Sequence, residues 1–148
     1  MNDLITKEMI LLDLDVNTKG EVIEKLAQVL QVHDRLHDFG GFIDQVHKRE
    51  ETFPTSLGYN FAIPHGKCNA VKTAALAFAR LNKEVQWSDE EKAKYVFLIA
   101  VSEQEAGDTH LKILAQLSRS IMREEFREKL EASTSVHDII NLLSFQTQ

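Results

Sequence analysis

The sequence predicts an α/β fold: a single domain in which a mixed β-sheet is sandwiched between α-helices in three layers. The first observation is the order of patterns, with one strand-like segment, two amphipathic helical segments, several apolar strand-like segments and a final helical run. The second is that residues 95–101 are apolar enough for a strand buried on both faces. The 148 residues suit one hydrophobic core, and we find no internal repeat, linker or low-complexity tract. We therefore expect residues 1–148 to form one domain.

A strand and a helix are predicted at the start of the chain. Ile10–Leu14 is a short apolar segment interrupted by Asp13, which suits a strand that leads into a turn. Thr18 and Glu21 then have the spacing of a capping box at the start of a helix. The apolar residues of this helix share one face: Val22, Ile23, Leu26, Val29 and Leu30. We expect that face to pack against the core.

A second helix is predicted after the polar segment of residues 33–38. Its apolar face consists of Phe39, Phe42, Ile43 and Val46. We expect this helix to end near Lys48 or Arg49. Beyond it, residues 50–66 contain two prolines and two glycines, which interrupt any regular helix.

The middle of the chain is predicted to supply the core of the sheet. Residues 74–81 and 95–101 have the length and the apolar composition of strands. Residues 85–87 suit a short strand between them, and the charged residues 89–94 suit a solvated turn.

The C-terminal part of the chain has a helical pattern from Asp108 onward. Asp108 or Thr109 can cap the first turn. The expected apolar face of this helix consists of Leu111, Leu114, Leu117 and Ile121. Two shorter helices should follow, the first containing Phe126 and Leu130 and the second beginning at Ser135.

Composition and charge argue against several classes of protein. Seventeen basic and 23 acidic residues give a net charge of −6, and no basic run is present to follow a nucleic-acid backbone. No apolar stretch approaches the roughly 20 residues of a membrane-spanning helix, and the first residues do not resemble a secretory signal. The single cysteine, Cys68, cannot form an internal disulfide. We expect a cytoplasmic protein that does not insert into a membrane or bind nucleic acid.

His65 is the first candidate for chemistry. It follows the apolar residues 61–63 and Pro64, which has a restricted φ and no N–H, and it precedes the flexible Gly66. An imidazole held at the end of a strand beside an unobstructed backbone suits a nucleophile near an anion-binding site. A capped structural histidine is the alternative.

His110 and Arg49 are two further candidates. His110 lies at the expected start of a helix, where free N–H groups and the helix dipole favour a phosphate. Arg49 can offer a permanent charge and several donors to a phosphoryl group. The alternatives are a surface histidine in a first helical turn and a solvated arginine in the charged run of residues 48–51.

Cys68 lies three residues after His65, so two other sites must be weighed. One is a thiol–imidazole catalyst, and the other is a zinc site formed by His65, Cys68 and His110. A single His-x-x-Cys pair lacks the paired spacing that makes zinc motifs specific.

The segment LGYNFAIPHG, residues 57–66, with Glu50 seven residues before Leu57, resembles the signature of the fructose and mannitol class of enzyme IIA (EIIA) domains of the sugar phosphotransferase system (PTS). The resemblance extends to Arg49 upstream, to His110 at the start of a helix, and to the order of elements over nearly the whole chain. Phe61 differs, because the family usually has a smaller aliphatic residue there. Residues 52–57 also resemble the galactitol-type branch.

This resemblance implies a type-2 EIIA domain that acts as a phosphotransferase. His65 would be the phosphorylated residue, His110 its neighbouring active-site histidine and Arg49 a charge-stabilising partner. The donor would be the histidine phosphocarrier HPr, and the acceptor a cognate enzyme IIB that acts with a membrane subunit, IIC. The resemblance implies no metal and no cofactor.

Two other functions stay open at this point. The nitrogen-related branch of the family has a similar motif but uses its phosphorylation state to control partner proteins. A zinc- or cysteine-dependent hydrolase is the third possibility, and it requires Cys68 for activity.

Overall fold

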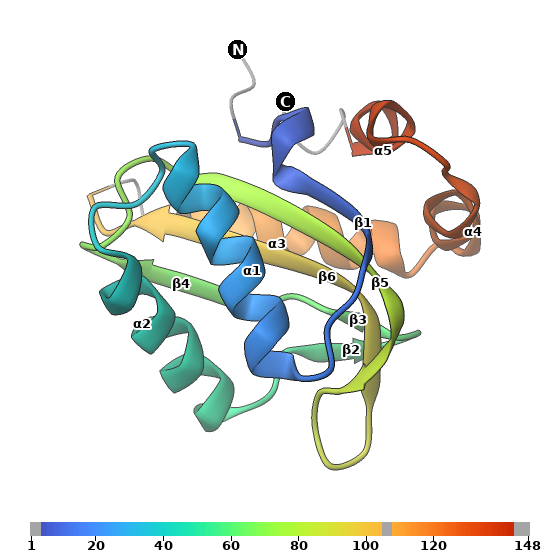
Figure 1. Ribbon diagram of the computed structural model, residues 1–148, viewed down its shortest axis with the longest axis horizontal. Coiled ribbons are helices and arrows are strands. Elements are labelled where there is room, and N and C mark those ends of the chain that lie inside the picture. Colours follow the sequence, from blue (N-terminus) through green and yellow to red (C-terminus); the bar gives the residue numbers. More distant parts are fainter. Residues whose placement is uncertain (1–3, 105–107, 144–148) are drawn as a thin grey trace.

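The computed structural model describes residues 4–104 and 108–143, which form one mixed sheet with helices on both faces (Figure 1). In chain order the elements are η1 (Lys7–Met9), β1 (Ile10–Leu14), α1 (Lys19–Val32), α2 (Phe39–Thr52), β2 (Ser56–Gly58), β3 (Phe61–Ala62), β4 (His65–Cys68), β5 (Ala75–Gln86), β6 (Lys92–Ser102), α3 (Asp108–Ile121), α4 (Glu124–Ala132) and α5 (Val136–Leu143). The predicted fold class is confirmed.

Six strands form the sheet in the described part of the chain. Their order is β1-β5-β6-β3-β2, and β4 also pairs with β6. The pairs β1–β5, β3–β6 and β4–β6 are parallel, whereas β5–β6 and β2–β3 are antiparallel. Residues 95–102 of β6 are all buried, as expected of a central strand covered on both faces.

Helices cover both faces of this sheet. Figure 1 shows α1 and α2 in front of the sheet and α3 behind it, with α4 and α5 beside β1. Helix α1 packs on β5 and β6, α2 packs on β4, and α5 contacts β1. Among the described residues, no helix has the length and hydrophobicity needed to cross a membrane.

The helix starts confirm the predictions from capping residues. Thr18 and Glu21 form a complete capping box at the start of α1, in which the Thr18 hydroxyl accepts a hydrogen bond from the Glu21 N–H at 3.1 Å. The Ser135 hydroxyl accepts from the Asp138 N–H at 3.1 Å at the start of α5.

Two strand predictions need correction. Residues 85 and 86 of the predicted short strand at 85–87 are the end of β5, which is one continuous strand of 12 residues, and Trp87 follows it. The register between β5 and β6 shifts between Arg80 and Val85, so the exposed residues 82–84 interrupt the apolar pattern without ending the strand. Strand β3 ends at Ala62, before His65, as the sequence predicts, but His65 itself begins a further strand, β4, which the sequence does not predict.

Two helix predictions also need correction. Helix α2 ends at Thr52 and not near Lys48 or Arg49, because the helical hydrogen bonds continue until Pro54 interrupts them. In α3 the predicted Leu111 is 62% exposed, and the buried apolar positions are Ile113, Leu117 and Ile121. The side chains of Asp108 and Thr109, the predicted caps, lie outside the described residues.

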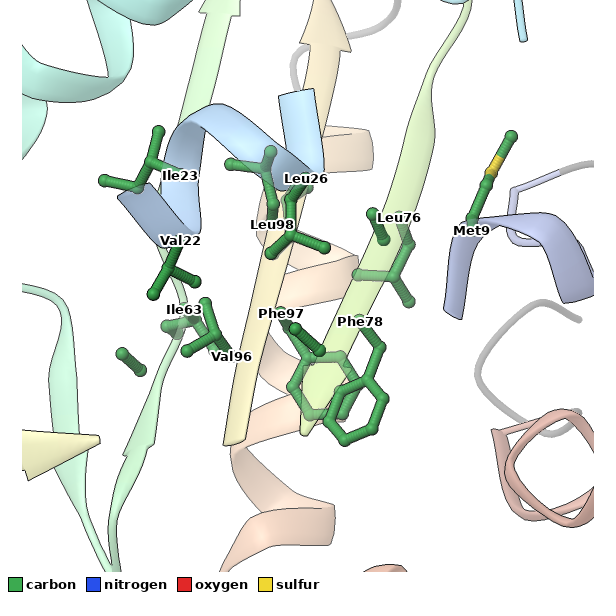
Figure 2. Packing of buried hydrophobic residues seen from close by; sticks show 14 of the residues in the cluster. Met9, Val22, Ile23, Leu26, Ile63, Leu76, Phe78, Val96, Phe97 and Leu98 are labelled. Carbon is green, nitrogen blue, oxygen red and sulfur yellow. The ribbon is translucent and has the colours of Figure 1, made fainter. Parts of the chain in front are cut away.

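The core contains a row of aromatic rings across β3, β5 and β6. Phe61 stacks on Tyr95 with ring centroids 4.7 Å apart, and Phe78 lies 4.6 Å from Phe97. Figure 2 shows how side chains from α1, η1 and the central strands gather in one hydrophobic cluster. The aromatic Phe61 is therefore accommodated by pairing with the aromatic Tyr95 directly opposite it on β6.

Arg80 joins β5 to the end of α4. It is only 9% exposed, and its Nη1 donates to the carbonyl oxygens of Leu130 at 2.9 Å and Ser133 at 2.7 Å. Its Nη2 lies 3.7 Å from the exposed carboxylate of Asp13. Because the last carbonyls of a helix have no partner within the helix, Arg80 satisfies groups that would otherwise be buried without hydrogen bonds.

We expect Arg80→Met to lower the free energy of unfolding by about 2–3 kcal/mol, because methionine fills the space but leaves these carbonyls unpaired. Urea denaturation followed by circular dichroism measures the change. Lys83→Met, an exposed position on the same strand, serves as the control. Equal stabilities of the two variants would contradict the role given to Arg80.

Candidate active site

His65 lies at a break in the edge of the sheet next to β6. Strands β3 and β4 both run parallel to β6, and residues 63 and 64 separate them. Pro64 has no N–H to offer the ladder, although its carbonyl still accepts the Ile99 N–H at 3.0 Å. His65 then begins β4 opposite Ile99. The break holds the imidazole at a defined position on a rigid strand.

Gly66 allows α2 to approach β4 closely. A Cβ atom at this position would lie 3.1 Å from Cε1 of Phe42 and 3.2 Å from Cγ2 of Val46, both closer than ordinary packing allows. The absence of a side chain therefore brings α2, which carries Arg49, against the strand that carries His65.

The imidazole of His65 has a defined tautomer. Its Nδ1 lies 2.9 Å from the carbonyl oxygen of Ile63. A carbonyl oxygen only accepts hydrogen bonds, so Nδ1 carries the proton and donates it to Ile63. The lone pair of the neutral ring is then on Nε2.

The surroundings of His65 favour its neutral form. Burial is the largest influence and lowers the pKa of His65, because the residue is only 7% exposed and a charged imidazole would lose hydration. The hydrogen bond to Ile63 raises the pKa, the charge of Arg49 lowers it, and the charge of Glu50 raises it, in that order of importance. The net effect lowers the pKa of His65, which favours the neutral imidazole near physiological pH.

Arg49 lies in the last turn of α2, half-buried and close enough to His65 to influence its charge. Its Nη1 donates to the carbonyl oxygen of Phe53 at 2.5 Å, just beyond the end of the helix. The structure thus brings Arg49 into the neighbourhood of His65, as the sequence predicts, and shows that it also satisfies a carbonyl at the end of α2.

The third predicted residue, His110, lies in the first turn of α3, but its side chain is outside the described part of the chain. The alternatives based on Cys68 gain no support. Positions 65 and 68 of a strand point to opposite faces of the sheet, and burial raises the pKa of the Cys68 thiol. Among the side chains that the structure describes, residues 4–104 and 111–143, no group of His, Cys, Asp or Glu is arranged to hold a metal.

Glu50 is a buried charged residue to which the sequence analysis assigns no role. It is 5% exposed and accepts hydrogen bonds from Lys19, Thr55 and Trp87. The charged residues 48–51 suggest a solvated surface, yet Glu50 follows the buried Phe42 and Val46 at intervals of four. That helical spacing is the signal that places it on the inward face.

Comparisons with known proteins agree on one family. Residues 3–146 match the family described as "Phosphoenolpyruvate-dependent sugar phosphotransferase system, EIIA 2". The chain is 34% identical over 145 residues to Multiphosphoryl transfer protein 2 of Escherichia coli K12, covering 98% of this chain and 17% of that protein. It is 36% identical over 138 residues to the PTS system fructose-specific EIIA component of Haloferax volcanii, covering 90% of this chain and 89% of that protein.

Two solved structures show the same fold. The nitrogen regulatory protein IIA-Ntr from Neisseria meningitidis has a TM-score of 0.87 and 26% identity, covering 95% of this chain and 97% of that one. The mannitol enzyme IIA in complex with phosphorylated enzyme IIB from Escherichia coli has a TM-score of 0.81 and 26% identity, covering 96% and 99%.

The matches differ in how much of each relative they cover. The chain spans only 17–23% of the length of the first three curated relatives, which are larger proteins, but nearly the whole of the Haloferax component. Because the family match extends over almost all 148 residues and agrees with the motif around His65, the chain belongs to the EIIA 2 family of the phosphoenolpyruvate-dependent sugar phosphotransferase system.

Proposed function

We propose that this chain is the phosphocarrier of a sugar phosphotransferase system, with His65 as the phosphorylated residue. The observation that carries the proposal is the buried, neutral imidazole whose Nδ1–H donates to the carbonyl oxygen of Ile63, which leaves the lone pair of the ring on Nε2. That arrangement suits nucleophilic attack on a phosphoryl group without prior loss of a proton from the attacking nitrogen.

In the proposed reaction, Nε2 of His65 attacks the phosphorus of a phosphohistidine on HPr. The new P–N bond forms at Nε2 as the P–N bond of the donor breaks. The donor ring, protonated on its other nitrogen, leaves as a neutral imidazole, and the ring of His65, which keeps its Nδ1 proton, takes over the positive charge. The second transfer repeats these changes toward a cysteine or histidine of an enzyme IIB. In each step, negative charge is spread over the three oxygens of the transferred group.

Arg49 is proposed to stabilise that charge. Its guanidinium acts on His65 from the end of α2 and can reorient from the carbonyl of Phe53 toward a phosphoryl group on Nε2. His110, in the first turn of α3, is proposed to donate to the same group, at a helix start that favours anions.

The partners follow from relatives and are part of the proposal. The solved structure of a mannitol enzyme IIA contains a phosphorylated enzyme IIB, which supports a IIB acceptor for this chain. HPr as the donor, a membrane IIC subunit beyond IIB and a cytoplasmic location complete the proposed system. The named relatives include fructose-specific and mannosylglycerate-specific components, so the proposal is made for sugar transport as a class.

Phosphate incorporation tests this function. The chain is incubated with phosphoenolpyruvate, enzyme I and HPr and is examined by intact mass before and after mild acid treatment. We expect a gain of one phosphoryl group that is lost in acid and retained in base, as for a phosphohistidine. A chain that gains no phosphate from competent donors would contradict the proposal.

A regulatory role is the second candidate, and the close structural likeness to a nitrogen regulatory IIA protein favours it. The two functions differ in the fate of the phosphate. A transport component passes its phosphate to an enzyme IIB within one reaction cycle, whereas a regulatory module keeps it and changes its affinity for a partner protein. Transfer from the purified phosphorylated chain to IIB proteins from the same genome distinguishes them.

A further inference from the structure

The carboxylate of Glu50 joins α2 to three other parts of the fold. Its Oε1 lies 2.8 Å from Nζ of Lys19 in the first turn of α1 and 3.1 Å from Nε1 of Trp87 at the turn between β5 and β6. Thr55, in the loop after α2, donates its N–H to Oε1 at 3.2 Å and its hydroxyl to Oε2. A carboxylate accepts all four of these bonds because it has only acceptor sites.

A chain of hydrogen bonds leads from this carboxylate to His65. Glu50 holds the backbone of Thr55, whose carbonyl oxygen accepts the Ile63 N–H at 3.1 Å. The carbonyl oxygen of Ile63 in turn accepts the Nδ1–H of His65 at 2.9 Å. Each link fixes the peptide that forms the next link, so the orientation of the Ile63 carbonyl depends on where Glu50 holds Thr55.

We propose that Glu50 is a positioning residue for His65: through Thr55 and Ile63 it fixes the tautomer and the orientation of the imidazole. The inference rests on the proposed phosphoryl transfer for its consequence in catalysis, although the structural link itself is independent of that function. In-line transfer needs Nε2 aimed at the phosphorus, and a hydrogen bond at Nδ1 is the contact that aims it.

The surroundings of Glu50 are consistent with a positioning role. A buried carboxylate adds little to stability, because its desolvation offsets the gain from its partners. Its partners here reach from α1, from the β5–β6 turn and from the loop before β2, so Glu50 fixes the relative positions of the elements around His65.

The charge of Glu50 and the length of its side chain could each influence His65, and the two effects lead to different predictions. Among the described residues, the charged groups that act on His65 are Arg49 and Glu50, both on α2, and the charge of Glu50 raises the pKa of His65. If only this charge mattered, a shorter carboxylate would serve as well. If the hydrogen bonds to Thr55 matter, a side chain of equal length is needed, whether charged or neutral.

The pair Glu50→Gln and Glu50→Asp separates the two effects. Glutamine keeps the reach: its carbonyl oxygen can accept from Thr55, Trp87 and Lys19, and its amide can donate to the Thr55 hydroxyl. Aspartate keeps the charge but withdraws the carboxylate by one methylene group. Glu51→Gln and Glu51→Asp, at the exposed neighbouring position of α2, are the matched controls.

We expect Glu50→Asp to lower the maximal rate of phosphate acceptance from phosphorylated HPr by about tenfold, because a small displacement of a nucleophile is costly in rate. The KM for the donor should change less than twofold, since Glu50 is only 5% exposed and offers a docked partner almost no surface. Glu50→Gln should stay within about threefold of the native rate. The controls should behave as the native chain.

Nitrogen NMR of labelled histidine gives a readout that does not depend on catalysis. The native chain should show His65 with the proton on Nδ1, and Glu50→Asp should show a mixture of tautomers. Glu50→Gln should keep the native tautomer while the pKa of His65 falls, because the anion that favours the charged ring is gone. Thr55→Val, which removes only the hydroxyl donor, should shift the tautomer in the same direction as Glu50→Asp. This variant provides the test if Glu50→Asp does not fold.

The outcomes separate this inference from the proposed function. A native chain that accepts no phosphate but shows the predicted tautomer changes would contradict the function and retain the structural link. If the native chain accepts phosphate, and Glu50→Asp and Thr55→Val both keep the native rate and the native tautomer of His65, the positioning role of Glu50 is overturned. A slower Glu50→Gln with a native Glu50→Asp would also overturn it, in favour of charge alone.

Discussion

The His65→Gln variant is expected to accept phosphate at less than about one thousandth of the native rate, because the amide of glutamine offers no lone pair that can form a stable bond to phosphorus. Glutamine is close to histidine in size, and its amide N–H can still donate to the Ile63 carbonyl, so the fold should be retained. Intact mass after incubation with enzyme I, HPr and phosphoenolpyruvate measures the effect.

The other histidines provide controls for this result. His47→Gln and His137→Gln change a half-buried and an exposed histidine away from the break between β3 and β4, and both variants should accept phosphate normally. His110→Gln should accept phosphate more slowly but still gain one group, since the proposal makes His110 a donor and not the nucleophile. If His65→Gln became phosphorylated and His110→Gln did not, His110 would be the nucleophile and the proposed roles of the two histidines would be reversed.

Arg49→Gln is expected to lower the rate of phosphate acceptance by about a hundredfold, the usual effect of removing one donor that stabilises transition-state charge. The loss should be larger in the maximal rate than in the KM for the donor, because the charge develops during transfer. Lys48→Gln, the exposed neighbouring cation, is the control and should retain the native rate.

The same variant should move the pH dependence in a defined direction. Arg49 lowers the pKa of His65, since a nearby cation disfavours the protonated ring. Without Arg49 the pKa rises, so the acid limb of the rate profile should shift to higher pH. Arg49→Lys should restore the position of that limb but only part of the rate, because an ammonium supplies the charge without the planar array of donors. An unshifted acid limb in Arg49→Gln would contradict the electrostatic link.

Local patterns account for the elements that the sequence predicts well. The capping box at Thr18 marks the start of α1, and the apolar spacing of residues 22–30 identifies its buried face. The run of residues 95–101 is apolar throughout, which is the pattern of a strand covered on both sides. These features depend on neighbouring residues, so they can be read from the chain directly.

The errors arise where the result depends on a distant partner. Residues 85 and 86 belong to β5 because β6 offers a long antiparallel partner across a register shift. Leu111 fits a helical row of leucines but is exposed, because the sheet contacts the neighbouring face of α3. Helix α2 extends to Thr52, with Glu50 turned toward the core where Trp87 and Lys19 can reach it.

The sequence by itself determined the fold class, the family signature around His65 and the choice of candidate residues, because these follow from local periodicity and a contiguous motif. Only the tertiary structure decided the protonation state and the geometry of the site. The tautomer of His65 depends on the Ile63 carbonyl, and its pKa depends on burial and on Arg49 and Glu50. The close approach of α2 that brings those charges near depends on packing against Gly66. Hydration and Coulomb interactions depend on distances through space, which a one-dimensional pattern does not contain.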